Sequence, residues 1–189
     1  MTTKTDAPSI AAAPISSTGR RAVAIALGAL VVALAAQFRI PLPFTPVPVT
    51  LQDLAVLTVG GLLGPVAGTA ALVTYLAMGI AGLPVFSGGA AGLPWLLGPT
   101  GGYLLAFPVA AFMTGRLARG AGLGRALLAA LAGMVIIHLG GVAQLALLTG
   151  DLAGAFALGS LPFLPAAVLK VALAAGLVVG LAPKVSRLV

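Results

Sequence analysis

Apolar residues dominate six long runs along this chain. The runs cover residues 22–38, 49–63, 66–83, 101–117, 126–148 and 161–181. Several approach the ~20 residues that an α-helix needs to cross the hydrocarbon core of a bilayer. The pattern therefore predicts an all-α integral membrane protein whose six transmembrane helices form one domain over residues 20–189.

The second apolar run and the N-terminal region leave alternatives open. The second run is short, and Pro65 separates it from the third, so a re-entrant segment is the alternative to a full span. Residues 1–19 are rich in Ser, Thr, Ala and Pro and have no apolar stripe, which predicts a disordered tail. Arg20 and Arg21 precede the first run, a pattern shared by signal peptides, but we interpret this run as a membrane helix.

The distribution of positive charge favours an even number of spans. With six spans, eight of the ten Lys and Arg residues fall on one side of the membrane and Arg39 falls on the other. Cytoplasmic loops retain Lys and Arg, so both termini are expected in the cytoplasm of a multi-pass protein of the prokaryotic cell membrane. The eight residues are Lys4, Arg20, Arg21, Arg116, Arg119, Arg125, Lys184 and Arg187.

Composition narrows the classes of function. The chain is 60% apolar and 7% charged, with a mean hydropathy of +1.19 and a pI near 11.3. Its basic residues are scattered, which argues against a nucleic-acid surface. The chain has one His, three acidic residues and no Cys, so no metal site is expected. An intramembrane hydrolase would need Ser160 and His138 as its catalytic pair. No phosphate-binding loop is present, so any ATP hydrolysis must come from another polypeptide.

Small residues form a stripe on the predicted first helix. Ala22, Ala26, Ala29, Ala33 and Ala36 recur every three or four positions and therefore share one face. Such stripes mark the place where another helix approaches closely in a membrane. The neighbouring helix could belong to a partner protein or to this chain, and the pattern does not distinguish the two.

Lys170 is the strongest single candidate for a functional residue. It falls midway along the last run, where an ionisable group is expensive unless it faces a cavity or a partner. Helical spacing places Phe163, Ala166, Ala167 and Ala174 on the same face. The alternative is a lysine that extends its ammonium group to the lipid headgroups.

Two connections on the predicted outer side are rich in Pro and Gly. They cover residues 39–48 and 84–100, and the second holds Phe86 and Trp95. We expect them to form a lid over an outer site, with ordinary connectors as the alternative.

Polar side chains within the predicted helices are few. Gln52 and Asp53 begin the second helix and could bind a ligand near the outer surface or cap the helix, and we favour capping for Asp53. His138 and Gln144 lie about 120° apart on the fifth helix, so we do not expect them to serve one site.

Three stretches resemble the BioY family, the biotin-specific substrate-binding components of energy-coupling factor transporters. The first reads Ile-Pro-Leu-Pro-Phe-Thr-Pro-Val-Pro-Val-Thr-Leu-Gln over residues 40–52. The second runs from Gly-Leu-Pro-Val-Phe at 82–86 to Leu-Gly-Pro-Thr-Gly-Gly-Tyr at 97–103. The third is Leu-Pro-Phe-Leu-Pro at 161–165, followed by Lys170.

The resemblance implies a six-helix receptor that captures external biotin and delivers it to the cytoplasm. It implies that the first helix docks onto a transmembrane coupling subunit driven by two ATPase subunits, which would place Ala22, Ala26, Ala29 and Ala33 at that contact. It also implies that biotin is enclosed by the 84–100 connection and the helices beneath it. The chain itself would use no cofactor and catalyse no reaction.

The resemblance further suggests a set of biotin-binding residues. Lys170 would meet an oxygen-bearing end of the ligand, aromatic side chains would pack its rings, and glycine backbone would approach it closely. The full set is Lys170, Tyr103, Phe86, Trp95, Gln52, Thr45, Gly101, Gly102 and Ala167.

The chain departs from the family pattern at two positions. Relatives commonly carry Gly-Asp after the final Pro-Phe-Leu-Pro, where this chain has Ala166 and Ala167, and many carry Arg where this chain has Ala90. Lys170 therefore lacks its expected counter-charge. We favour substitution by Asp53 or a backbone carbonyl; the alternatives are a ligand related to biotin, weakened binding, or a membrane scaffold without a small ligand.

Overall fold

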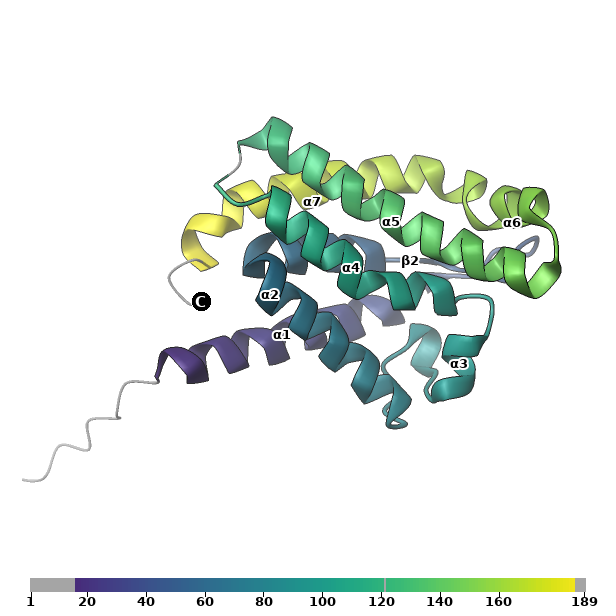
Figure 1. Cartoon of the computed structure of the whole chain (residues 1–189), viewed down its shortest axis with the longest axis horizontal. Coiled ribbons are helices and arrows are strands. Elements are labelled where there is room, and N and C mark those ends of the chain that lie inside the picture. The colour runs from purple at the N-terminus through teal and green to yellow at the C-terminus, as the bar shows by residue number, and fades with distance from the viewer. Residues whose placement is uncertain (1–15, 121, 186–189) are drawn as a thin grey trace, which may run out of the picture.

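The chain folds into a bundle of helices that run roughly along one long axis (Figure 1). A computed structural model describes residues 16–120 and 122–185. The long helices are α1 (Ser17–Gln37), α2 (Gln52–Ile80), α4 (Gly101–Leu117), α5 (Leu123–Thr149) and α7 (Leu164–Val185). Shorter elements are β1 (Arg39–Ile40), β2 (Val49–Thr50), η1 (Ser87–Gly89), α3 (Leu93–Leu97), α6 (Leu152–Gly159) and η2 (Leu161–Phe163).

Helix α2 is two helices joined at a sharp turn. Gly64 has φ 78° and ψ 177°, a backbone conformation that favours glycine, and Pro65 starts the second half at a position where its missing N–H costs little. The chain turns back so tightly that a Cβ on Gly68 would lie 2.9 Å from the Cα of Gly60. Residues 52–63 and 65–80 therefore correspond to the second and third apolar runs.

Four stretches of described helix are long and apolar enough to cross a membrane: Ser17–Gln37, Gln52–Ile80, Leu123–Thr149 and Leu152–Val185. Helix α4 has 17 residues and is only slightly shorter. At 1.5 Å per residue it extends over roughly 26 Å, close to the thickness of the hydrocarbon core. Counting the two halves of α2 separately, the described residues contain six long helical segments at the positions of the six apolar runs.

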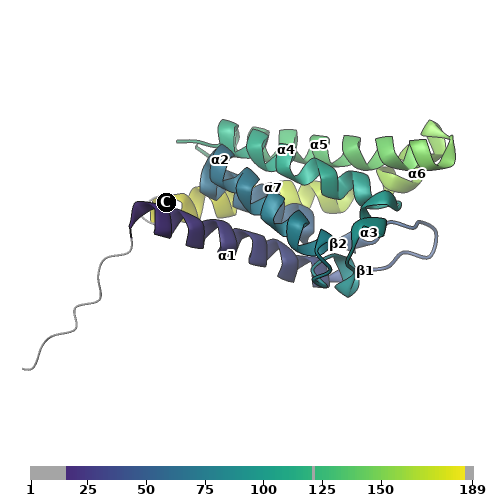
Figure 2. The ribbon, with the colours of Figure 1, turned by 60° about the horizontal axis from the view of Figure 1, so that its bottom comes forward.

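The two ends of the bundle differ. One end, which we call the hairpin end, carries the β1–β2 hairpin, α3 and α6 (Figures 1 and 2). The other, the terminal end, carries the start of α1, the end of α7 and the α4–α5 turn. The antiparallel pairing of Arg39 with Thr50 closes the Pro-rich 39–48 connection.

Close contacts between small residues hold the helices together. A Cβ on Gly60 would lie 2.6 Å from the carbonyl oxygen of Ala111, and a Cβ on Gly115 would lie 2.6 Å from that of Gly60. Helices α2 and α4 therefore cross with their backbones in contact, as expected where packing rather than hydrophobicity drives association. Many leucines, including Leu139 and Leu147, face outward and are exposed.

The alanine stripe of α1 is divided between two environments. Ala29, Ala33 and Ala36 are 1%, 6% and 0% exposed, and the first two belong to the main core of this chain. Ala22 and Ala26 are exposed. In this structure Ala29 and Ala33 are buried inside the chain, so the predicted docking contact rests on Ala22, Ala26 and their exposed neighbours.

One boundary differs from that predicted, and two short helices are additional. Helix α1 begins at Ser17, with the Ser16 hydroxyl accepting a hydrogen bond from the Gly19 N–H, so the boundary expected at residue 20 lies inside a helix. Residues 1–15 of the predicted tail lie outside the described part of the chain. Helices α3 and α6 are also additional to the six predicted segments.

Candidate functional site

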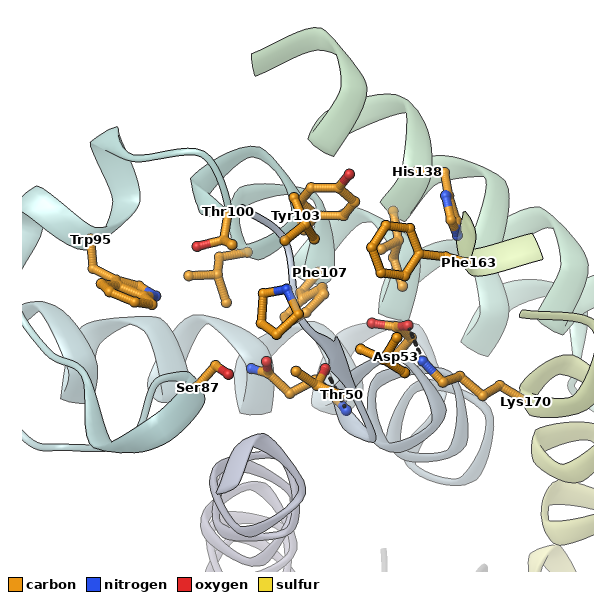
Figure 3. A pocket seen from close by; sticks show the side chains of 16 residues that line it. Thr50, Asp53, Ser87, Trp95, Thr100, Tyr103, Phe107, His138, Phe163 and Lys170 are labelled. Atoms are coloured by element: carbon orange, nitrogen blue, oxygen red, sulfur yellow. Dashed lines mark hydrogen bonds and ion pairs between the residues drawn. The ribbon is translucent and has the colours of Figure 1, made fainter. Parts of the chain in front are cut away.

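A small cavity lies near the hairpin end, between the first half of α2, α4, α5, α7 and the two connections (Figure 3). It encloses about 50 Å³. Its walls combine aromatic rings with a few polar groups, as ligand pockets commonly do. The lining residues are Val47, Pro48, Val49, Thr50, Gln52, Asp53, Ser87, Trp95, Thr100, Tyr103, Leu104, Phe107, Ile137, His138, Phe163 and Lys170.

An ion pair forms part of one wall. The Lys170 ammonium donates to Asp53 Oδ2 at 2.6 Å, and the two side chains are 9% and 21% exposed (Figure 3). This is the one ion pair among the described residues. Lys170 therefore points inward and does not extend to the headgroups, because its ammonium group has a partly buried acid as partner.

Asp53 does not cap α2, contrary to the sequence-based expectation. The N-cap residue Leu51 makes no side-chain cap, and the Thr50 hydroxyl accepts from the Gln52 N–H at 3.3 Å. The Asp53 carboxylate accepts from Lys170 instead. The two residues lie 117 positions apart, in the first turn of α2 and the second turn of α7. Tertiary packing therefore overrides a local preference for capping.

Four aromatic side chains line the cavity: Trp95 from α3, Tyr103 and Phe107 from α4, and Phe163 from η2, with Trp95 at the side away from the ion pair (Figure 3). The Tyr103 hydroxyl donates to the carbonyl oxygen of Gly159 at 2.5 Å. Tyr103 thereby links α4 to the end of α6 while its ring faces the cavity. Together the rings provide flat apolar walls in a cavity that also holds a charged pair.

Gln52 couples the cavity wall to the connection above it. Its side-chain amide donates to the Tyr75 hydroxyl at 2.6 Å, and that hydroxyl donates to the carbonyl oxygen of Val85 at 3.2 Å. Gln37 also donates to the carbonyl oxygens of Val85 and Phe86, at 3.4 and 3.3 Å. Polar side chains of α1 and α2 therefore hold the first part of the 84–100 connection over the cavity.

Ser87 is a cavity residue that sequence reasoning missed. It is 5% exposed, lines the cavity, and is the one buried side chain among the described residues whose polar atom has no hydrogen-bond partner. Leaving a buried hydroxyl unpaired costs about 1–3 kcal/mol. Its position directly after Phe86, in the second stretch of family resemblance, was the available signal.

Five of the predicted binding residues lie outside the cavity wall. Phe86 is fully buried, with its ring edge-on to Tyr75 at a centroid distance of 5.6 Å. The Thr45 hydroxyl donates to the carbonyl oxygen of Leu158 at 2.9 Å. Ala167 faces a separate apolar groove between α5 and α7. These three residues shape the surroundings of the cavity rather than its surface.

Gly101 and Gly102, the other two, permit close helix packing. A Cβ on Gly102 would lie 2.6 Å from the Cβ of Gln144, and one on Gly101 would lie 2.6 Å from the Gln144 amide nitrogen. That amide donates to the carbonyl oxygens of Leu96 and Gly98, at 2.8 and 2.6 Å. Gln144 thus secures the end of the connection, whereas His138 lines the cavity, in agreement with their predicted separation.

His138 contacts Ser160. Its Nδ1 lies 3.1 Å from the serine hydroxyl oxygen, and His138 lines both the cavity and the apolar groove. A hydrolytic triad would also need an acid to orient the imidazole. The acid in this cavity is Asp53, which bonds to Lys170, so the geometry favours a structural hydrogen bond between α5 and the end of α6.

Arg39 lies against the 84–100 connection, close to Gly88. Ala90 in the same connection is the position where the family pattern commonly has Arg. The Arg39 guanidinium group occupies the place that a side chain at Gly88 would take, and Gly88 has a φ of 71°. Glycine at this turn therefore makes room for the one basic residue predicted on the outer side.

Comparisons with known proteins agree with this architecture. Residues 5–187 match the sequence profile of the BioY family. The chain is 40% identical over 158 residues to the probable biotin transporter BioY of Pyrococcus horikoshii, covering 82% of this chain and 93% of that protein. It is 39% identical over 137 residues to the biotin transporter BioY of Thermotoga maritima, covering 72% and 81% of the two chains.

A solved structure has the same fold. The crystal structure of an S-component for biotin from an ECF-type ABC transporter superposes with a TM-score of 0.83. That chain is 27% identical, and the match covers 91% of this chain and 95% of the other. With its long apolar helices, the protein described here is a multi-pass membrane protein. The family profile covers almost the entire chain, and this protein belongs to the BioY family.

Proposed function

We propose that this chain is the biotin-binding subunit of an ATP-driven vitamin importer of the energy-coupling factor class. The observation that carries the proposal is the Asp53–Lys170 pair in an aromatic-lined cavity. The names of the relatives and of the S-component structure support biotin as the ligand.

The ion pair suits the ureido ring of biotin. That ring offers two N–H donors and one carbonyl acceptor, so a carboxylate can accept from an N–H while an ammonium group donates to the carbonyl. Asp53 and Lys170 provide these two groups 2.6 Å apart. In this proposal Asp53 supplies the acid that relatives place in the last helix, which explains how the chain tolerates Ala167.

The second polar end of biotin, its carboxylate, is expected at the opposite side of the cavity. Ser87 and Trp95 lie on that side, away from Asp53 and Lys170 (Figure 3). The unpaired Ser87 hydroxyl can donate to a carboxylate, and Arg39 is the nearby cation. A ligand with two polar ends and an apolar middle therefore matches the order of groups along the cavity.

Biotin entry requires the walls to move. Drug-sized ligands occupy pockets of roughly 300–1,000 Å³, far more than the 50 Å³ enclosed here. The 84–100 connection is the wall proposed to move, because it is the part of the cavity wall that belongs to no long helix. The side-chain hydrogen bonds that hold it at Val85 and Leu96 would break on opening. Opening this lid would admit the ligand from the hairpin end.

Charge sets the orientation of the protein in the membrane. Among the described residues, the basic residues other than Arg39 and Lys170 belong to elements at the terminal end. The tendency of cytoplasmic segments to retain positive charge therefore favours six spans, both termini in the cytoplasm and a binding site that opens outward. The exposed face of α1 around Ala22 and Ala26 would meet the coupling subunit, which two ATPases drive.

Equilibrium binding of biotin to the purified protein tests the proposal, with desthiobiotin and thiamine as comparators. We expect saturable, biotin-selective binding. We expect Lys170→Ala to lower the affinity for biotin at least about tenfold, which corresponds to ~1.4 kcal/mol. Because an unpaired Asp53 would also destabilise the fold, Lys170→Met combined with Asp53→Asn serves as the matched variant without a stranded charge.

The outcomes separate the alternatives. Selective binding that survives in the folded double variant would remove the ion pair from the binding site. Absence of saturable binding by well-folded wild-type protein would favour a scaffold without a small ligand. Selective binding of a biotin relative would reassign the ligand and leave the receptor role intact.

A further inference from the structure

A second cavity lies at the terminal end, far from the biotin site. It encloses about 420 Å³ between the start of α1, the Gly64 turn of α2, the α4–α5 turn and the end of α7. Arg21 from α1 and Arg119 from the α4–α5 turn both line it. We call it the arginine cavity.

Neither arginine has an acidic partner among the described residues. No hydrogen bond or ion pair joins Arg21 or Arg119 to another described side chain, and the described acids, Asp53 and Asp151, belong to the hairpin end. The Arg119 guanidinium lies over the turn of α2, with Nη2 3.3 Å from the place a Cβ on Gly64 would take. Two cations from separate elements therefore face one hollow, and no carboxylate of residues 16–120 or 122–185 neutralises them.

The remaining lining complements an anion that carries apolar groups. Val66 and Ala67 line the cavity and belong to the first turn after Pro65, where a helix start presents N–H groups and a partial positive charge. The other walls come from leucine, alanine and glycine, including Leu62, Leu63 and Ala182. Because the cavity lies at the helix ends, it is level with the lipid headgroups of the inner leaflet.

We propose that the arginine cavity binds the phosphate group of an anionic phospholipid. The two guanidinium groups would hold the phosphate oxygens, and the leucine and alanine walls would hold the glycerol and the first acyl carbons. An inorganic phosphate ion shares the charge but gains nothing from the apolar walls. The proposal is independent of the biotin site and of its ligand.

Lipid retention by the delipidated protein tests this assignment. Short-chain dioctanoyl phosphatidylglycerol is titrated into the protein in neutral detergent, and bound lipid is counted by native mass spectrometry. Dioctanoyl phosphatidylcholine, whose phosphate is offset by choline, and inorganic phosphate form the other two arms. We expect one phosphatidylglycerol to be retained in preference to phosphatidylcholine, and inorganic phosphate not to displace it.

Matched variants distinguish a site from general attraction. Arg21→Gln with Arg119→Gln should weaken phosphatidylglycerol retention about twenty-five-fold, at roughly fivefold per arginine. Arg116→Gln with Arg125→Gln removes the same charge outside the cavity and should change retention little. Ala182→Phe keeps every charge but fills the cavity, and should also weaken retention.

Each variant is checked by size-exclusion chromatography and thermal melting, so that lost binding is compared only among folded proteins. Arg119→Lys adds a variant that keeps the charge and should retain most of the binding. Equal losses in the two double variants would overturn the proposal, because they indicate diffuse attraction. Displacement of the lipid by inorganic phosphate would also overturn it, in favour of a free-anion site.

Discussion

Buried ionic groups in this protein are few, and their partners decide what they do. The Asp53–Lys170 pair satisfies two charges that would each be costly alone in hydrocarbon. A pair of this kind contributes little net stability, because desolvation offsets most of its attraction. We propose instead that the pair serves recognition, because it keeps a donor and an acceptor facing the cavity until a ligand with complementary groups arrives.

Ser87 provides a residue-scale prediction. Ser87→Ala removes a buried hydroxyl that has no partner in the protein, so the fold should be unaffected or slightly more stable. If the hydroxyl donates to the carboxylate of biotin, the affinity for biotin should fall by roughly tenfold, as for a hydrogen bond to a charged group. The affinity for biotin methyl ester, which lacks that charge, should change much less. Competition binding with both ligands measures the difference.

A uniform effect on both ligands would place Ser87 away from the carboxylate. Thr100→Val is the matched control, since Thr100 also lines the cavity but is only partly buried.

At the scale of elements, glycine contacts set the distances between helices. Gly60 and Gly115 bring the backbones of α2 and α4 together, and Gly102 does the same for α4 and α5. Because lipid is as apolar as leucine, such contacts replace the hydrophobic effect as the source of helix association. The cavity exists between these helices, so its shape depends on their spacing.

Gly115→Val tests the tight crossing of α2 and α4. The new side chain would collide with the carbonyl oxygen of Gly60 and with the Gly64 turn, so we expect a loss of about 1–3 kcal/mol from overpacking. Gly176→Val makes the same change on α7 at a position with open space around it, and should melt close to the wild type. Thermal unfolding in detergent compares the two variants. Equal melting temperatures would mean that the crossing tolerates a larger side chain.

The long helical elements were predictable from the sequence, whereas the short ones were not. Six apolar runs correspond to α1, the two halves of α2, α4, α5 and α7, because helices that face lipid need long stretches of apolar residues. Pro65 marked the turn within α2. Helices α3 and α6 have five and eight residues, and their apolar composition resembles that of the neighbouring spans, so no periodicity separated them.

The candidate site was predicted in part. Lys170 and Gln52 were singled out from their positions in apolar segments, and Tyr103 and Trp95 were added to the site by resemblance; all four line the cavity. The pairing of Asp53 with Lys170 could be predicted only as one of several ways to replace the acid missing at Ala167. The local sequence favours capping by Asp53, and Lys170 lies on another helix. The alanine stripe likewise indicated a helix contact without identifying the neighbouring helix. Small residues pack equally well against a helix of this chain and a helix of a partner protein.

At the scale of the whole molecule, topology gives a prediction that needs no ligand. The chain has no cysteine, so single-cysteine variants can be labelled without background. With six spans, Thr18→Cys and Gly122→Cys should react with a membrane-impermeant maleimide only after cells are permeabilised, because both lie at the terminal end. Phe44→Cys, in the exposed hairpin connection, should react in intact cells. Labelling of Thr18→Cys and Phe44→Cys from the same side would contradict this topology.

The separation of Asp53 from Lys170 has a consequence for biogenesis. The first half of α2 is synthesised 117 residues before the lysine that neutralises its acid. At bacterial rates of translation, the nascent chain carries that carboxylate without its cation for on the order of ten seconds. During this interval the earlier helices can be in the membrane, yet the wall of the cavity is incomplete. Arrival of α7 from the ribosome is therefore the event that finishes the binding site, and a chain cut short before it would never contain one.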